Sequence, residues 1–257
     1  MNQTQRRIIL INKLLQENGE YSDIAIPSEE KDQRRLLRSL MNVRVPSEIS
    51  EEFKVVQDEY LQTINKERGI VSLADLSPIE KGIYLWRGDI TRLACGAIVN
   101  AANSGMTGCY RPCHNCIDNC IHTYAGIQLR NKCNELMVEQ GNQEPTGRAK
   151  ITQGYNLPCD YVIHTVGPIV QGDLTKEHCK QLESCYKSCL EIADANNIKS
   201  IAFCCISTGV FMFPNEKAAK IAVEAVRKYR EETGSQIEVI FNVFTEQDEE
   251  IYRGLLG

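Results

Sequence analysis

Four cysteines, two histidines and one aspartate fall within the fifteen residues of GCYRPCHNCIDNCIH, which spans residues 108–122. Zinc takes cysteine thiolates and histidine nitrogens readily, and Cys109, Cys113, His114 and Cys116 are spaced so that one loop can supply several ligands. The spacing therefore predicts a zinc site, with reduced thiols that simply line a cleft as the alternative. Four protein ligands would close a structural site, whereas three would leave a position for water or substrate.

The composition of the whole chain excludes several classes of protein in which such a site could occur. A net charge of −5 and a pI near 5.5 give no field that would gather nucleic acid or anionic lipid. No run approaches the ~20 apolar residues of a membrane span. Asn12 and Lys13 interrupt the apolar run near the N-terminus, which argues against a signal peptide. We expect a monomeric, cytoplasmic protein that contacts neither nucleic acid nor membrane, with its twelve cysteines reduced.

Several cysteines away from this loop have the pattern of core residues. Cys185 and Cys189 lie four apart, with Leu182 and Ile192 at helical spacing around them, which is typical of a buried helix face. A second pair, residues 204–205, falls in the short apolar run SIAFCCIS, which is typical of a buried strand.

The chain divides into two regions that differ in composition and in predicted secondary structure. Residues 1–80 are rich in charge and contain three helix-like segments, the last of which is predicted to begin near Ser47 and end at Gly69, so we expect a small N-terminal helical appendage. In residues 81–257, short apolar runs alternate with longer helical patterns, which predicts an α/β domain with a central sheet covered by helices on both faces. The expected strands are 82–88, 96–103, 149–156, 161–168, 200–207 and 238–244, and the expected helices are 117–140, 175–196, 215–233 and 246–255.

Three loops of this domain have the composition of ligand-binding segments. Asp89, in GDIT, can accept a hydrogen bond from an amino group such as that of adenine, or can cap a helix. The run Ser207–Phe211 contains Gly209 ahead of a helix and can present amides to a phosphate; no Walker lysine follows, which disfavours a P-loop triphosphatase. In VNAANSGMTG, Asn100 and Asn103 offer amide groups, although turn chemistry alone could explain either.

Taken together and in this order, GDIT, VNAANS, TGRAKITQGYNLPCDYVIHTVGP and STGVFMFP resemble the macrodomain family over roughly the last 175 residues. The resemblance implies a three-layer α/β/α fold with a mixed central sheet and a deep cleft for ADP-ribose. By position it suggests that Asp89 and the Ile90 amide hold the adenine, with Phe244 against its ring. Asn103 would face the distal ribose. The diphosphate would be wrapped by the loop of Ser207, Thr208, Gly209, Val210 and Phe211.

The cysteine-rich segment is similar to that of the zinc-dependent branch of this family, whose Cys-x4-His-x-Cys arrangement precedes Ile-Asp-Asn. The match falls on Cys109, His114 and Cys116, with Cys113 as an extra thiol. The similarity to hydrolytic macrodomains of the MacroD type implies a catalytic role for Asp118, although a carboxylate there could instead cap the helix or stabilise its first turn. His122 follows one turn later and can face the same way, whereas His164 in a separate apolar run is expected to be a satisfied core residue.

These resemblances imply a zinc-dependent hydrolase that removes mono-ADP-ribose from modified proteins, with aspartyl or glutamyl esters as the expected linkages. Asp118 would orient or deprotonate the attacking water, while Asn103 and Phe211 would hold the ribose. The alternatives are a non-catalytic reader of ADP-ribosylated proteins with a structural zinc, an O-acetyl-ADP-ribose deacetylase, and a thiol-based redox sensor. Three ligands favour the enzyme, and a closed set that includes Cys113 favours the reader.

Overall fold

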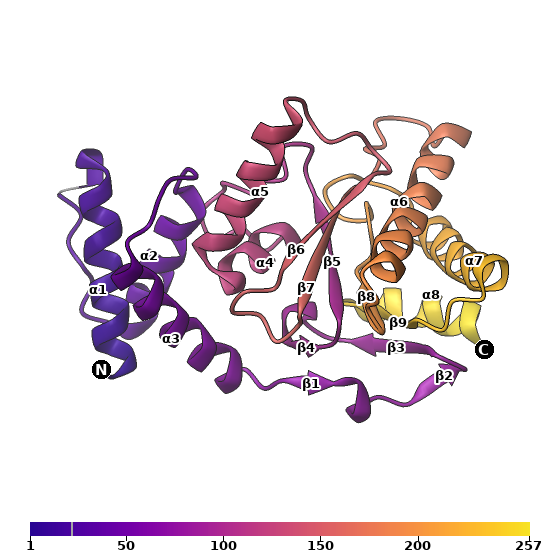
Figure 1. Ribbon diagram of the computed structural model, residues 1–257, viewed down its shortest axis with the longest axis horizontal. Helices are drawn as coiled ribbons and strands as arrows, with labels where there is room; N and C mark the ends of the chain where they lie inside the picture. Colours follow the sequence, from indigo (N-terminus) through magenta and orange to yellow (C-terminus); the bar gives the residue numbers. More distant parts are fainter. Residues whose placement is uncertain (22) are drawn as a thin grey trace.

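The computed structural model describes residues 1–21 and 23–257, and the N-terminal helices form a bundle at one end of it (Figure 1). The bundle consists of α1 (Gln3–Glu17), α2 (Glu30–Val43) and α3 (Glu51–Glu67), with a short 3-10 helix, Gly19–Tyr21, after α1. Its helices bury a hydrophobic cluster of their own, to which Ile127 from the following domain also belongs. The expected helical appendage is therefore present, with a separate core.

Helix α3 begins later than its sequence predicts. Ser50, rather than Ser47, is the N-cap, because its hydroxyl accepts a hydrogen bond from the Phe53 amide at 3.1 Å. Gly69 has a φ of 81°, the left-handed conformation expected of a residue that ends a helix.

A seven-stranded sheet forms the centre of the remainder, in the order β2-β3-β9-β8-β5-β7-β6. The five inner strands are mutually parallel, while edge strands β2 and β6 run antiparallel to their neighbours. The expected mixed sheet is thus confirmed. The strands are β2 (Pro78–Glu80), β3 (Ile83–Arg87), β5 (Ala97–Ala102), β6 (Ala149–Gln153), β7 (Tyr161–Val166), β8 (Ser200–Phe203) and β9 (Glu238–Val243).

Residues 71–80 connect the bundle to this sheet. Strand β1 (Val71–Ser72) pairs in parallel with β4 (Leu93–Ala94), and a 3-10 helix, Leu73–Asp75, leads on to β2, which joins the edge of the large sheet. The boundary after residue 80 stays a prediction, but backbone pairing with the α/β domain already begins at residue 71.

Helices cover both faces of the sheet and complete the expected three layers (Figure 1). One face carries α4 (Ile117–Ala125) and α5 (Ile127–Gln140), and the other carries α6 (Lys176–Ala195), α7 (Asn215–Thr233) and α8 (Glu246–Leu256). Strand β5 is almost fully buried at the centre, as expected of a parallel strand covered on both sides. Cys185, Cys189 and Cys204 are buried in this core, which confirms their interpretation as packing residues.

The continuous helix predicted over 117–140 is wrong, because the chain breaks at Gly126 into α4 and α5. Gly126 has a φ of 98°, and a Cβ there would lie 2.7 Å from Gln57 Nε2 of α3. The Gln57 side chain then accepts a hydrogen bond from the Ile127 amide at 3.0 Å, which caps the new helix. A residue of the distant bundle thus stabilises the break, and the local helical pattern could not reveal it.

Within the described residues, no helix combines the length and the apolar character needed to cross a membrane. All twelve cysteines lie in described residues, and each is a free thiol.

Candidate functional site

The predicted binding residues collect along one edge of the sheet, at the carboxyl ends of its parallel strands. Asp89 follows β3, Phe244 follows β9, the 207–211 loop follows β8, and Asn103 follows β5. These four strands are consecutive neighbours in the sheet. The edge therefore carries a row of groups in the order expected for adenine, diphosphate and distal ribose, which is the usual location of ligands in such folds.

The candidate metal ligands come together in the loop between β5 and α4. Cys109 Sγ lies 3.5 Å from His114 Nδ1, and the ligand atoms of Cys109, His114 and Cys116 are all within 4.8 Å of one another. In a tetrahedral zinc site with bonds of about 2.3 Å to sulfur and about 2.1 Å to nitrogen, the two atoms would be about 3.6 Å apart. The donor types and their spacing thus fit zinc.

The remaining thiol of the loop is directed elsewhere. Cys113 has a φ of 52°, and its Sγ lies 3.2 Å from Ser39 Oγ and 3.5 Å from the carbonyl oxygen of Arg35, both in α2. Among the described residues, Cys113 is therefore outside the group of potential metal ligands. Three ligands rather than four match the arrangement that leaves one coordination position open.

Asp118 lies beside this group, in the first turn of α4, and its carboxylate is buried. Its Oδ1 accepts a hydrogen bond from Asn100 Nδ2 at 2.8 Å, and its Oδ2 accepts one from Asn103 Nδ2 at 3.3 Å. Burial raises the pKa of Asp118 to about 6, while the bond from Asn100, the charge of Arg130 and the bond from Asn103 oppose the rise. The N-cap of α4 is Cys116, so Asp118 does not cap the helix; it projects toward the amide groups of β5 and the loop that follows.

The two histidines of this region are buried behind Asp118. His164 contacts Asn100 Nδ2 at 3.1 Å and Thr152 Oγ1 at 2.9 Å, which confirms it as a satisfied core residue. Burial lowers its pKa to about 4, and burial also holds the pKa of His122 well below its usual value. His122 Nε2 is 3.6 Å from Asp118 Oδ1, and its ring nitrogens have no hydrogen-bond partner in the part of the chain that the structure describes.

A second set of possible metal ligands, His122, Cys133 and His164, lies within 4.8 Å of one another in the core. This set suits a metal less well than the loop does, because both ring nitrogens of His164 already contact polar groups.

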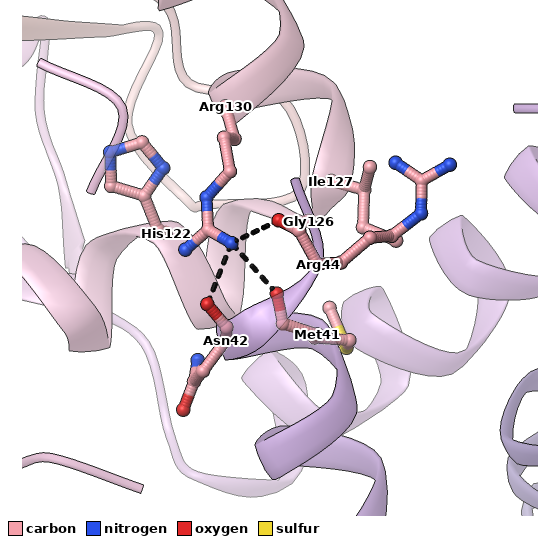
Figure 2. A pocket seen from close by; sticks show the side chains of 7 residues that line it. All are labelled: Met41, Asn42, Arg44, His122, Gly126, Ile127 and Arg130. Carbon is pink, nitrogen blue, oxygen red and sulfur yellow. Dashed lines mark hydrogen bonds between the residues drawn. The ribbon is translucent and has the colours of Figure 1, made fainter. Parts of the chain in front are cut away.

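A small cavity of about 10 Å³, the scale of one water molecule, adjoins His122 where α2 meets α4 and α5 (Figure 2). Arg130 of α5 lines it, and its Nη1 donates hydrogen bonds to the carbonyl oxygens of Met41, Asn42 and Arg44 at 3.1, 2.7 and 2.7 Å. These carbonyls are at the C-terminus of α2, which a buried cation stabilises. Arg130 also lies 4.4 Å from the centroid of the Tyr110 ring in the cysteine-rich loop.

The loop after β8 presents backbone amides at the sheet edge. Within the described residues, the amides of Gly209, Val210 and Phe211 donate no hydrogen bond. Ser207 is buried with a φ of 67°, and Thr208 Oγ1 bonds back to the Cys205 carbonyl at 3.0 Å, so these two residues shape the loop. Free amides ahead of α7 are suited to a diphosphate.

At the far end of the row, Asp89 caps a helix, and its expected role as an acceptor for adenine stays a prediction. Its Oδ1 accepts hydrogen bonds from the Thr91 amide at 3.0 Å and the Thr91 hydroxyl at 2.6 Å, which caps the 3-10 helix Ile90–Arg92, and Ile90 itself is buried. Its Oδ2 forms an ion pair with Arg68 at the end of α3, and a carboxylate oxygen can still accept a further bond from an amino group. Phe244 is 76% exposed, so its ring is accessible to a planar base.

Several polar contacts around the site were not identified from the sequence. Asn100 was noted for its amide group, but its bond to Asp118 depends on how α4 packs on β5. Arg38 and Arg68 contact the site from the N-terminal bundle, and no spacing rule connects them with the loops they reach. Asn119 is the last residue of the Ile-Asp-Asn run in the cysteine-rich segment, but the sequence assigned it no contact.

Comparisons with known proteins agree with this geometry. Residues 99–222 match the model of the Macro domain family. The chain is 56% identical over 261 residues to a protein-ADP-ribose hydrolase of Treponema medium, with all of both chains covered. It is 47% identical to a protein of the same name from Staphylococcus aureus strain MSSA476, over 95% of this chain and 92% of the relative.

Solved structures give the same result. The Trypanosoma brucei macrodomain in complex with ADP-ribose superimposes with a TM-score of 0.68 at 30% identity, covering 86% of this chain and 95% of that one. The Oceanobacillus iheyensis macrodomain with ADP gives a TM-score of 0.63 at 33% identity, covering 70% and 93%. Because residues 99–222 match the Macro domain model and the 56% identity to the Treponema medium relative extends over the whole chain, N-terminal helices included, this chain belongs to the macrodomain family.

Proposed function

We propose that this protein hydrolyses mono-ADP-ribose from modified protein side chains, with aspartyl and glutamyl esters as substrates, and that the activity depends on zinc held by Cys109, His114 and Cys116. The observation that carries the proposal is the three-ligand group beside a buried carboxylate, from which Cys113 is turned away. A structural site in a reader would be expected to close its coordination shell. The names of the relatives from Treponema medium and Staphylococcus aureus also support hydrolysis.

Substrate binding follows from the row of groups at the sheet edge. The free amides of Gly209, Val210 and Phe211 bind the diphosphate without any positive side chain, which agrees with the acidic net charge of the protein. Asp89 accepts a hydrogen bond from the adenine amino group, and the exposed Phe244 ring stacks on the base. The distal ribose then reaches the end of β5, where Asn103 and Asp118 lie 3.3 Å apart.

Hydrolysis adds water across the ester, which regenerates the side-chain carboxylate and releases ADP-ribose. Asp118 orients the attacking water and accepts its proton, and Asn100 and Asn103 hold the carboxylate in place for this. Asn103 also donates to the Gly108 carbonyl at 3.1 Å, which couples the ribose end of the site to the metal loop. Cys109, His114 and Cys116 would hold a zinc ion, which would supply Lewis acidity that polarises a reacting oxygen.

The test compares proteins that carry aspartyl- or glutamyl-linked ADP-ribose with one that carries a seryl linkage. Zinc-loaded enzyme should release ADP-ribose from the esters, and chelation should abolish release until zinc is restored. The same turnover after complete metal removal would refute the role of zinc. Tight binding of modified protein without any release would identify a reader instead.

A further inference from the structure

Helix α2 of the N-terminal bundle contacts the cysteine-rich loop at two adjacent points, although about 70 residues separate them along the chain. Arg38 Nη2 donates a hydrogen bond to the His114 carbonyl at 2.7 Å and another to Asn119 Oδ1 at 3.0 Å. One turn later, Asn42 Oδ1 accepts a hydrogen bond from the Cys113 amide at 2.9 Å. The loop is therefore bonded to α2 directly on both sides of the peptide between residues 113 and 114.

Asn119, which accepts one of the hydrogen bonds from Arg38, also contacts the other two candidate ligands, Cys109 and Cys116. It is fully buried, and its Nδ2 donates to the carbonyls of Cys109 at 3.2 Å and Arg111 at 3.0 Å. Its backbone amide lies 3.5 Å from Cys116 Sγ. Arg38 thus fixes the backbone of one ligand directly, and through Asn119 it orients the side-chain amide that fixes the backbone of a second.

Helix α2 is itself held on both sides, so it can act as a rigid support. Its apolar face, with Leu37 and Leu40, is buried in the core of the bundle. On the opposite side Asn42 Nδ2 donates to Thr123 Oγ1 of α4 at 3.0 Å, and Arg130 of α5 binds the carbonyls at the end of α2 (Figure 2). A helix fixed against both cores holds its polar side chains at defined positions.

We propose that Arg38 is a positioning residue for the metal site and acts partly through Asn119. The N-terminal bundle would then help to orient the metal ligands. This inference rests on the proposed zinc site. Groups that orient metal ligands without touching the metal typically contribute about 10- to 100-fold to metal affinity. Within the described residues, Arg38 forms no hydrogen bond to the diphosphate loop or to Asp89. Its Nη2 bonds to His114, to Asn119 and, at 3.7 Å, to Cys120 Sγ, so its effect should centre on the metal loop and the start of α4.

The test replaces Arg38 in the full-length protein and measures metal binding without substrate. Arg38→Ala should weaken Zn²⁺ binding about 10- to 100-fold in competition with a chromophoric chelator. It should also shift or broaden the visible absorption bands of the Co²⁺-substituted protein, which report ligand geometry. ADP-ribose affinity by calorimetry should stay within about twofold, because the diphosphate amides are on another strand end. Arg38→Lys should recover part of the metal affinity, since its ammonium group can still donate hydrogen bonds.

Arg34→Ala is the matched control. Arg34 is on the same helix, but it pairs with Glu30 on the surface, and its loss should leave Zn²⁺ affinity and the Co²⁺ spectrum unchanged. If Arg38→Ala fails to fold, Arg38→Met keeps the apolar stem, removes every donor and decides the question by the same two measurements.

Two failures are distinguishable. Wild-type protein that binds no Zn²⁺ would overturn the proposed function at its metal site. Wild-type protein that binds Zn²⁺, together with Arg38 variants of equal affinity and identical Co²⁺ spectrum, would overturn the positioning role alone.

Discussion

Replacement of Asp118 by Asn separates chemistry from binding at this site. Asn keeps the size of the side chain and an oxygen that can accept the 2.8 Å hydrogen bond from Asn100. Its amide nitrogen would then face Asn103 Nδ2, 3.3 Å from the present oxygen, and this loss of one hydrogen bond costs about 1 kcal/mol. Because the variant no longer buries a charge, the net change in folding free energy should be small.

The effect on turnover should be far larger. A positioned general base contributes about 10²- to 10⁴-fold, which is roughly 3 to 5 kcal/mol of activation free energy. ADP-ribose affinity should change by no more than about twofold, since the diphosphate amides follow β8 and are independent of this carboxylate.

Single-turnover release of ADP-ribose from a glutamyl-modified protein measures the chemical step, and calorimetry with free ADP-ribose measures binding. Asp160→Asn, which alters an exposed aspartate, is the control. If Asp118→Asn kept more than about a tenth of wild-type turnover, Asp118 would not be the base. An equal loss of affinity and turnover would make it a binding residue.

Three further outcomes are expected. Cys116→Ala should lose bound zinc and turnover while Cys113→Ala keeps both, as measured by metal analysis and ADP-ribose release; equal zinc loss in the two variants would contradict the three-ligand assignment. Gly209→Val should weaken ADP-ribose binding by about 10-fold or more in calorimetry with an unchanged melting temperature, because a Cβ there meets no protein atom within 4 Å but would crowd a phosphate; full affinity would place the diphosphate elsewhere. In metal-free protein, the free energy of unfolding should fall as the pH drops from about 6.5 to 4, because burial lowers the pKa of His164 to about 4 and only the unfolded state is then protonated. This histidine should account for a loss of about 3 kcal/mol over that range. If denaturant titrations of His164→Gln gave the same pH slope as the wild type, His164 would not be the group responsible.

The fold was predictable because its signals are local. Short apolar runs and helical periodicity identify the parallel strands and the long helices, and helix α7 begins and ends at the predicted residues. The prediction that failed was a single helix over residues 117–140, because the helical pattern continues through Gly126 while the backbone turns there. The decisive partner there is Gln57, about 70 residues earlier, and periodicity carries no information about such a distant side chain.

In the site too, the features set by nearby residues were predictable and those set by distant residues were not. Cys109, His114 and Cys116 come together as their spacing within one loop suggests, because ligands so close in sequence need little help from the rest of the chain. Their supporting contacts are different in kind. Arg38 is one of several arginines on a charged helix, and nothing in its neighbourhood distinguishes it from Arg34 on the surface.

The dependence of the loop on the bundle follows from backbone hydrogen bonding. Residues 109–116 form neither helix nor strand, so their carbonyl and amide groups have no ladder to satisfy them. Partly buried backbone groups still need partners, and beside the His114 amide, which donates to the Arg111 carbonyl at 3.2 Å, the donors are the side chains of Asn119 and Arg38. Within the described residues, one backbone amide of the loop, that of His114, donates to a carbonyl of the loop itself. The other donors come from α4, which follows the loop, and from α2, so packing of the N-terminal bundle against the α/β domain helps to satisfy the backbone of the cysteine-rich loop.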